Sequence, residues 1–167
     1  MLKLQSLLKV FEYKFWSDTR LLEAIGALDK ESSLYAFCCQ QLNHMVIVEE
    51  LFQSRLLDQS PPHKETNTLS VPNFEELEQR LISSNSWYLK QVQSTATDAL
   101  SSDVNFVFAD GKQGSMTIYE IFFHISNHAT YHRSAIGHRI EYEGFVRPAD
   151  TYSLYIHVAE PERRTKS

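Results

Sequence analysis

The sequence has few of the residues that build turns and cross-links, and each shortage narrows the class of fold. Of its 167 residues only five are glycine and five are proline, which indicates long helices rather than many turns. The two cysteines, Cys38 and Cys39, are adjacent. Neighbours on a helix point about 100° apart, so a disulfide between them is disfavoured. Without other cysteines no disulfide scaffold can form, which suits a reducing compartment.

Charge and hydropathy exclude several kinds of partner. The formal net charge is −5, and no basic cluster lies on a recognisable helix or loop, so we expect no nucleic acid partner. No apolar run approaches the roughly 20 residues needed to cross a bilayer, so we expect no membrane span. The amphipathic start, MLKLQSLLKVFEYKFW, has no small-residue cleavage signal, and we expect a cytoplasmic location.

Apolar residues recur at helical spacing in four segments, with no internal repeat between them. The expected helices cover residues 2–28, 33–58, 73–100 and 117–144. The apolar stripe of the first has one polar exception, Asp18. Asn73 with Glu76, and Thr117 with Glu120, have the spacing of capping boxes and mark the starts of the last two helices. We therefore expect one all-α domain over the whole chain, 1–167, built as a four-helix bundle.

The two longest connections have different characters. Between the third and fourth helices, Val104, Phe106 and Phe108 alternate with polar or smaller residues, and Asp110-Gly111 is a hairpin turn signal. We expect a short β-hairpin there. The connection between the second and third helices, DQSPPHKETNTLSVP, is rich in proline, serine and threonine and reads as irregular. It is long enough for a crossover, so the helices need not alternate in direction.

The most specific chemical signal is the pair His128 and His132 in IFFHISNHATYHRSAIGHRI. Residues four apart share a helical face, with Cβ atoms about 5–6 Å apart, so both imidazoles can reach one cation. His44, on the apolar face of the second helix, would add a third ligand if the two helices face each other. Three imidazoles leave a coordination position open, which is typical of catalytic rather than structural sites. The pattern predicts a three-histidine metal site.

The remaining histidines leave one alternative open. His124 is also four residues from His128, so spacing alone allows the pair 124/128 as readily as 128/132, and His124 stays a candidate ligand or a second layer around the site. His138 lies six residues beyond His132, well around the helix, and we do not expect it on the same face. Two others, in the loop and the tail, are interpreted as ordinary surface or core residues: His63 and His157.

Other catalytic motifs are absent. No glutamate follows His128, so the HExxH pattern of zinc proteases is missing, and no phosphate-binding glycine loop or nucleophile elbow occurs. Glu49 and Glu50 lie within about two turns of His44, and we expect at least one of them to be a solvated carboxylate. Nothing in the sequence would depress a thiol pKa, so the two cysteines are interpreted as small core residues.

Three segments together resemble the DinB/YfiT-like superfamily: YKFWSDTRLLEAI, QQLNHMVIVEELF and FFHISNHATYHRSAI. The resemblance covers most of the chain, including the hairpin and the GFVRPAD-x-Y tail. It implies a four-helix bundle with up-down-down-up connections, and often a homodimer. It also implies that His44, His128 and His132 bind a divalent transition metal (zinc, nickel or iron), and it leaves His124 outside the coordination sphere.

What the resemblance implies about function is a class of activity. Members of the superfamily include thiol-dependent S-transferases and enzymes that hydrolyse or isomerise small molecules. We therefore expect a metal-dependent transferase or hydrolase whose partner is a small molecule, such as a low-molecular-weight thiol. The alternatives are a non-catalytic, metal-stabilised dimeric bundle and a stress-response binding module. One departure concerns the family's His-Arg-Gly-Gln sequence, because here Arg133 is followed by Ser134 and Ala135.

Overall fold

The structure, a computed structural model, describes residues 2–164. Met1 and residues 165–167, which the single-domain expectation includes, lie outside the described residues. The elements are, in order, α1 (Leu2–Gly26), α2 (Ser33–Leu56), α3 (Phe74–Ser94), η1 (Ala99–Ser101), β1 (Asp103–Val107), β2 (Gln113–Thr117), α4 (Ile118–Tyr142), α5 (Tyr152–Ala159) and η2 (Pro161–Arg163). The all-α class with a short hairpin is confirmed. Within the described residues, no helix is both long and apolar enough to cross a membrane.

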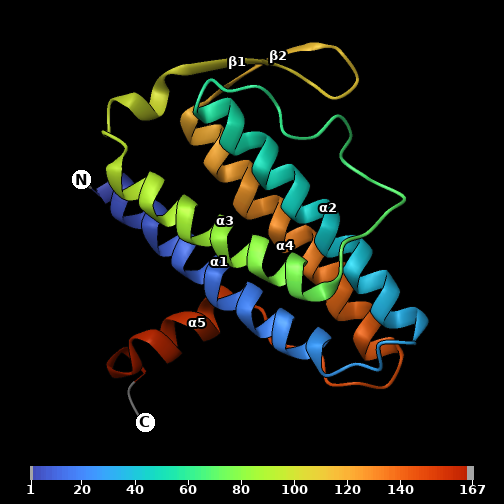
Figure 1. Ribbon diagram of the computed structural model, residues 1–167. Helices are drawn as coiled ribbons and strands as arrows, with labels where there is room; N and C mark the ends of the chain where they lie inside the picture. Colours follow the sequence, from blue (N-terminus) through green and yellow to red (C-terminus); the bar gives the residue numbers. More distant parts are fainter. Residues whose placement is uncertain (1, 165–167) are drawn as a thin grey trace.

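The direction of the four long helices is up-down-down-up, as the resemblance implied (Figure 1). In that view α1 and α4 run from the end of the bundle near the N-terminus to the opposite end, and α2 and α3 both run back. Because α2 and α3 are parallel, residues 57–73 must travel the length of the bundle to join them. We call residues 57–73 the strap. It lies against α2, where Asn43 Nδ2 donates a hydrogen bond to Thr68 Oγ1 at 2.8 Å.

Local signals set the starts of the later helices. The Asn73 side chain accepts a hydrogen bond from the Glu76 backbone N–H and so caps α3. Thr117 and Glu120 exchange both hydrogen bonds of a capping box at the start of α4. The predicted hairpin is confirmed as an antiparallel pair in which Phe106 lies opposite Gly114.

The third helix is shorter than predicted. It ends at Ser94, whereas the sequence pattern suggested that it fades near Leu100. The Thr95 backbone turns extended, and its hydroxyl donates to the Gln91 carbonyl at 2.7 Å. Asp98 then caps η1, and Leu100 in this short turn is buried in an apolar cluster of the core. A hydroxyl that bonds the carbonyl four residues back competes with continuation of the helix.

The two larger apolar clusters of the core are separated by a layer of buried charge. On α1 the chain passes from Phe11 in one cluster to Leu21 in the other, and Lys14 and Asp18 lie between them. Lys14 Nζ lies 2.8 Å from Asp18 Oδ2 and 2.7 Å from Glu49 Oε1, and both partners are buried. Burial disfavours ionised Asp18, yet the charges of Lys14 and Arg133 outweigh it and hold the pKa of Asp18 below its ordinary value.

The same layer fixes the C-terminal tail. Arg133 Nη1 donates to Asp18 Oδ1 at 2.9 Å, and Arg133 Nε donates to Asp150 Oδ2 at 2.8 Å. The hydroxyls of Tyr13 and Ser17 also donate to Asp150. The tail therefore returns to α1 at a defined point, and Tyr155 of α5 packs on Tyr13, beside α1 (Figure 1).

Candidate metal centre

The three predicted ligands meet on the seam between α2 and α4. One ring nitrogen from each of His44, His128 and His132 lies within 4.8 Å of the other two. His44 Nε2 and His128 Nε2 are 3.1 Å apart, and the ring centroids of His132 lie 4.6 Å from His44 and 4.4 Å from His128. All three side chains are partly exposed. The α2–α4 packing thus brings together histidines that are far apart in the sequence.

Two of the three rings are held by hydrogen bonds at the nitrogen that faces away from the others. His44 Nδ1 lies 2.7 Å from the Thr66 carbonyl oxygen in the strap. His132 Nδ1 lies 2.8 Å from Gln41 Oε1, one turn before His44 on α2. Because both partners are acceptors, each Nδ1 carries the proton, and each Nε2 is the unprotonated nitrogen. This is the arrangement that orients histidine ligands in metal sites.

The ring nitrogens of His128 show whether a cation fits between the three rings. Its Nδ1 is buried and has no hydrogen-bond partner among residues 2–164. Two nitrogens that bind one cation at about 2.0–2.1 Å, with an angle of about 90–110° between them, lie about 2.8–3.4 Å apart. The 3.1 Å between the Nε2 atoms of His44 and His128 falls in that range. The donor set and the spacing of this pair therefore fit a divalent transition metal.

The lowered pKa values of two of the rings favour binding of a metal cation over binding of protons. Burial, followed by the charges of His132 and His44, lowers the pKa of His128 to about 3. Burial and the charge of His44 lower the pKa of His132 to about 4. At neutral pH both rings are uncharged, which is the form that binds metal.

Comparison with known proteins agrees with this geometry. The profile of the DinB family matches residues 1–165. The chain belongs to the DinB family. A curated relative, Protein DinB of Bacillus subtilis (strain 168), is 21% identical over 170 residues, which cover 93% of this chain and 96% of the relative. No solved structure matches the chain. Membership in the DinB family and the group of three histidines together fit a DinB-like metal-binding protein.

The other histidines of this DinB-family chain lie outside the group of three. His124 is one turn before His128, with ring centroids 5.4 Å apart, but it packs against Phe52 at 4.9 Å. Burial, followed by the charge of Arg55, lowers the pKa of His124. His138 is exposed, as expected from its position on the helix. His63, in the strap, bonds the carboxylate of Glu50 rather than standing alone.

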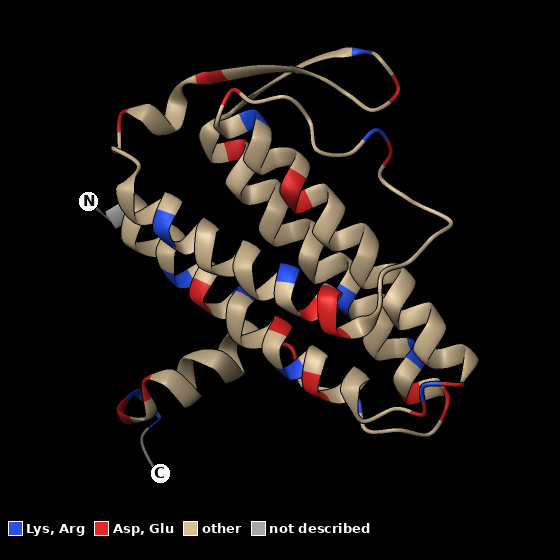
Figure 2. Cartoon of the chain, in the orientation of Figure 1, with Lys and Arg blue, Asp and Glu red and all other residues tan. Residues whose placement is uncertain are grey.

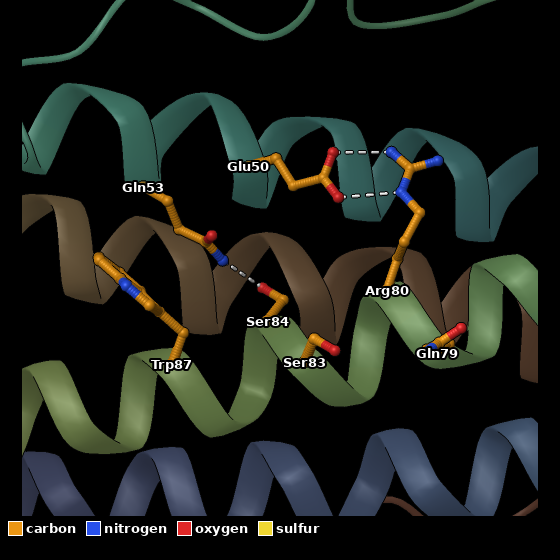
Figure 3. A pocket seen from close by; sticks show the side chains of 7 residues that line it. All are labelled: Glu50, Gln53, Gln79, Arg80, Ser83, Ser84 and Trp87. Carbon is orange, nitrogen blue, oxygen red and sulfur yellow. Dashed lines mark hydrogen bonds and ion pairs between the residues drawn. The ribbon is translucent and has the colours of Figure 1, made fainter.

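A separate hollow of about 350 Å³ lies between α2 and α3 in this DinB-family protein (Figure 3). Its lining contains none of the three histidines and consists of Glu50, Gln53, Gln79, Arg80, Ser83, Ser84 and Trp87. Arg80 donates to both oxygens of Glu50, at 2.9 and 2.7 Å. Glu49 is 1% exposed and accepts a hydrogen bond from Ser84. Neither glutamate is therefore a free surface carboxylate, and Glu49 belongs to the buried charged layer.

The cysteines have no part in the site. Both Cys38 and Cys39 are free and buried. Burial, followed by the neighbouring Cys39, raises the pKa of the Cys38 thiol to about 12. A thiol held protonated in the core is a packing residue, as the sequence indicated.

Sequence reasoning missed the two residues that orient the rings. Gln41 carries a signal, because it is a polar residue three positions before His44, a spacing that places both on the same helical face. Thr66 contributes only its backbone carbonyl, which every residue possesses, so no sequence pattern could have identified it.

Proposed function

We propose that this DinB-family protein is a metal-dependent enzyme that acts on a small molecule, with His44, His128 and His132 as the protein ligands of zinc, nickel or iron. The observation that carries the proposal is the convergence of three partly exposed imidazoles, two of them oriented by Gln41 and Thr66. Structural zinc sites use four protein ligands, whereas three protein ligands leave room for water or substrate.

The chemistry that we propose is transfer of a low-molecular-weight thiol to an electrophile. A divalent metal at this site would supply Lewis acidity, which lowers the pKa of a coordinated thiol or water. The chain itself holds the uncharged rings in place through Gln41 and Thr66, and their partial exposure gives a small molecule access. In the transfer, the thiol releases its proton to solvent, a sulfur–carbon bond forms, and the leaving group departs with its bonding pair.

The metal assignment is tested by elemental analysis of purified protein. We expect wild type to carry about one metal per chain and His128→Ala to lose it. His138→Ala is the matched control, because His138 lies on the same helix but is exposed and outside the group. Full metal content in His128→Ala would refute the assignment. A panel of thiols and electrophiles, assayed on the same preparation, then tests the transferase activity.

We also propose that the protein forms a homodimer through α4. Four aromatic side chains are exposed along this helix: Tyr119 (46%), Phe123 (61%), Tyr131 (71%) and Tyr142 (79%). Residues 121–132 contain no Lys, Arg, Asp or Glu, so this part of α4 is free of coloured charge in Figure 2. Exposed aromatic side chains on an uncharged stretch of helix favour a partner, and a second copy can pack the same surface in a twofold arrangement.

Light scattering distinguishes the oligomeric states. Wild type should have the mass of a dimer, and the double variant Phe123→Glu/Tyr131→Glu the mass of a monomer. A monomeric wild type would refute the dimer. If the bundle is instead non-catalytic and only stabilised by metal, a chelator should cause a large loss of thermal stability, and no thiol–electrophile pair should react.

A further inference from the structure

Two further side chains with nitrogen donors, His124 and Arg55, lie beside the three histidines along the contact between α2 and α4. His124 lies one turn before His128 on α4, with ring centroids 5.4 Å apart. Arg55 lies eleven residues after His44 on α2, which is about three turns, so the two side chains leave the same face of that helix. Phe52 stands between them, 4.9 Å from the His124 ring and 4.4 Å from the Arg55 guanidinium carbon.

Arg55 is a partly buried cation that has no anionic partner in the described part of the chain. Its guanidinium carbon lies 4.4 Å from the Phe52 ring and 4.2 Å from the Phe106 ring. Among the residues that the structure describes, Arg55 makes one hydrogen bond, from Nη2 to the Val107 carbonyl at a long 3.5 Å. Within residues 2–164, the ion pairs that involve arginine use Arg80, Arg133, Arg139, Arg147 and Arg163, and none uses Arg55. A guanidinium has five N–H donors, so most of those of Arg55 lack a protein acceptor.

His124 has the same property. Its ring packs on Phe52, but in the described part of the chain neither ring nitrogen makes a hydrogen bond. The side chain is only partly buried, so its nitrogens remain open to a ligand. Unused donors of Arg55 and His124 therefore lie on either side of the Phe52 ring. This part of the α2–α4 contact is the part nearer to the hairpin.

We propose that Arg55 and His124 bind the carboxylate of an elongated small molecule whose other end reaches His44, His128 and His132. This inference rests on the proposed function and adds a substrate class to it. The planar guanidinium matches a carboxylate in two parallel hydrogen bonds, and the aromatic walls strengthen such a pair by excluding water. Eleven helical residues span about 16 Å, which the length of the Arg55 side chain shortens, so the molecule should be on the order of 10 Å long.

A structural role predicts something different. If Arg55 serves only to hold the hairpin to α2 through Phe106, its replacement will lower stability without distinguishing charged from neutral ligands. The deciding measurement is therefore a ratio of affinities, carboxylate over alcohol, for two ligands of the same length. Loss of packing would change both affinities, whereas loss of a carboxylate site would change only their ratio.

The experiment uses cobalt-substituted protein, in which thiol binding produces a sulfur-to-cobalt absorption band. The long probes are mercaptooctanoate and mercaptooctanol, and the short ones mercaptopropionate and mercaptopropanol. Wild type should bind mercaptooctanoate about ten-fold or more tightly than mercaptooctanol, as expected for charge-assisted hydrogen bonds. Arg55→Gln should bring this ratio close to one, and Arg55→Lys should keep part of it. The ratio for the short pair, which cannot reach Arg55, should be the same in all variants.

Arg20→Gln is the matched control, because Arg20 also stacks on an aromatic ring, that of Trp16 on α1, and has no carboxylate partner in the described residues. It should leave the ratio for the long pair unchanged. An unchanged ratio in Arg55→Gln would overturn the proposal.

A second readout does not depend on the metal. Addition of octanoate, but not octanol, to the metal-free protein should shift the NMR signal of the Arg55 side-chain N–H, assigned by its loss in Arg55→Lys. If no thiol produces the cobalt band but octanoate shifts this signal, the thiol chemistry fails and the carboxylate site stands. If octanoate leaves the signal in place, the carboxylate site is refuted.

Discussion

Gln41 Oε1 lies 2.8 Å from His132 Nδ1, so a side chain on α2 orients a ring on α4. The same helix supplies His44 three residues later, so α2 both provides one of the three candidate ligands and positions another.

We predict that Gln41→Ala weakens zinc binding about 10- to 100-fold, because the acceptor that fixes the His132 ring is lost. Gln41→Glu should strengthen binding, since a charged acceptor makes the ring a better ligand. Competition with a chromophoric chelator measures both. Gln79→Ala, in the hollow between α2 and α3, is the control and should bind zinc as wild type does. Equal affinity in Gln41→Ala and wild type would contradict the role of Gln41.

We predict that Lys14→Met lowers the free energy of unfolding by about 3–5 kcal/mol, because it leaves Glu49 and Asp18 buried with less compensating charge. Urea denaturation measures the loss. The double variant Lys14→Met/Glu49→Gln should recover part of it, since one uncompensated carboxylate is then removed. Lys9→Met, which changes an exposed lysine on the same helix, should leave the urea midpoint nearly unchanged. A Lys14→Met protein as stable as wild type would be the contrary result.

We predict that the metal-free protein loses stability as the pH falls from about 6.5 towards 4. The folded-state pKa values of His128, about 3, and His132, about 4, lie below the ordinary histidine value of 6.5. Below pH 6.5, His128 and His132 therefore bind protons in the unfolded chain but stay unprotonated in the folded chain. Unfolding becomes more favourable as a result. Above 6.5 both states are unprotonated at these positions, and this contribution is constant.

Thermal melting of chelator-treated protein between pH 8 and 4 measures this dependence. The melting temperature of His128→Gln should decline less steeply with falling pH than that of wild type, because one of the two histidines with a lowered pKa is gone. His138→Gln, on the exposed face of α4, should decline as steeply as wild type. Parallel curves for wild type and His128→Gln would count against the buried, neutral state of His128.

The features predicted from the sequence are those whose cause lies within a few residues. Asn73 and Thr117 cap their helices through residues three positions away, and the turn at Asp110-Gly111 closes a hairpin between adjacent strands. Asp18 was visible as a polar residue on an apolar stripe, but the reason for it was not. Its partners come from α1, α3 and α4, and only packing brings them together.

The candidate metal centre shows the same difference between local and long-range causes. Helical spacing identified His128 with His132 but could not choose between that pair and 124/128. In the structure the choice depends on which rings face His44, and His124 turns to Phe52 instead. The length of α3 was overestimated because the bond from Thr95 back to Gln91, which ends it, competes with a sequence that is otherwise suitable for a helix.

The connection that the parallel helices α2 and α3 require, the strap, also restricts where residues can be inserted or deleted. Surface connections ordinarily accept insertions at small cost, because closing a longer loop loses little entropy. The strap is different, because the Thr66 carbonyl must lie next to His44 Nδ1 to form its hydrogen bond. Two residues later, Asn43 also donates a hydrogen bond to Thr68. An inserted or deleted residue next to Thr66 would move that carbonyl along α2 and free the His44 ring to rotate. An irregular surface connection is thus held to a fixed register at its centre.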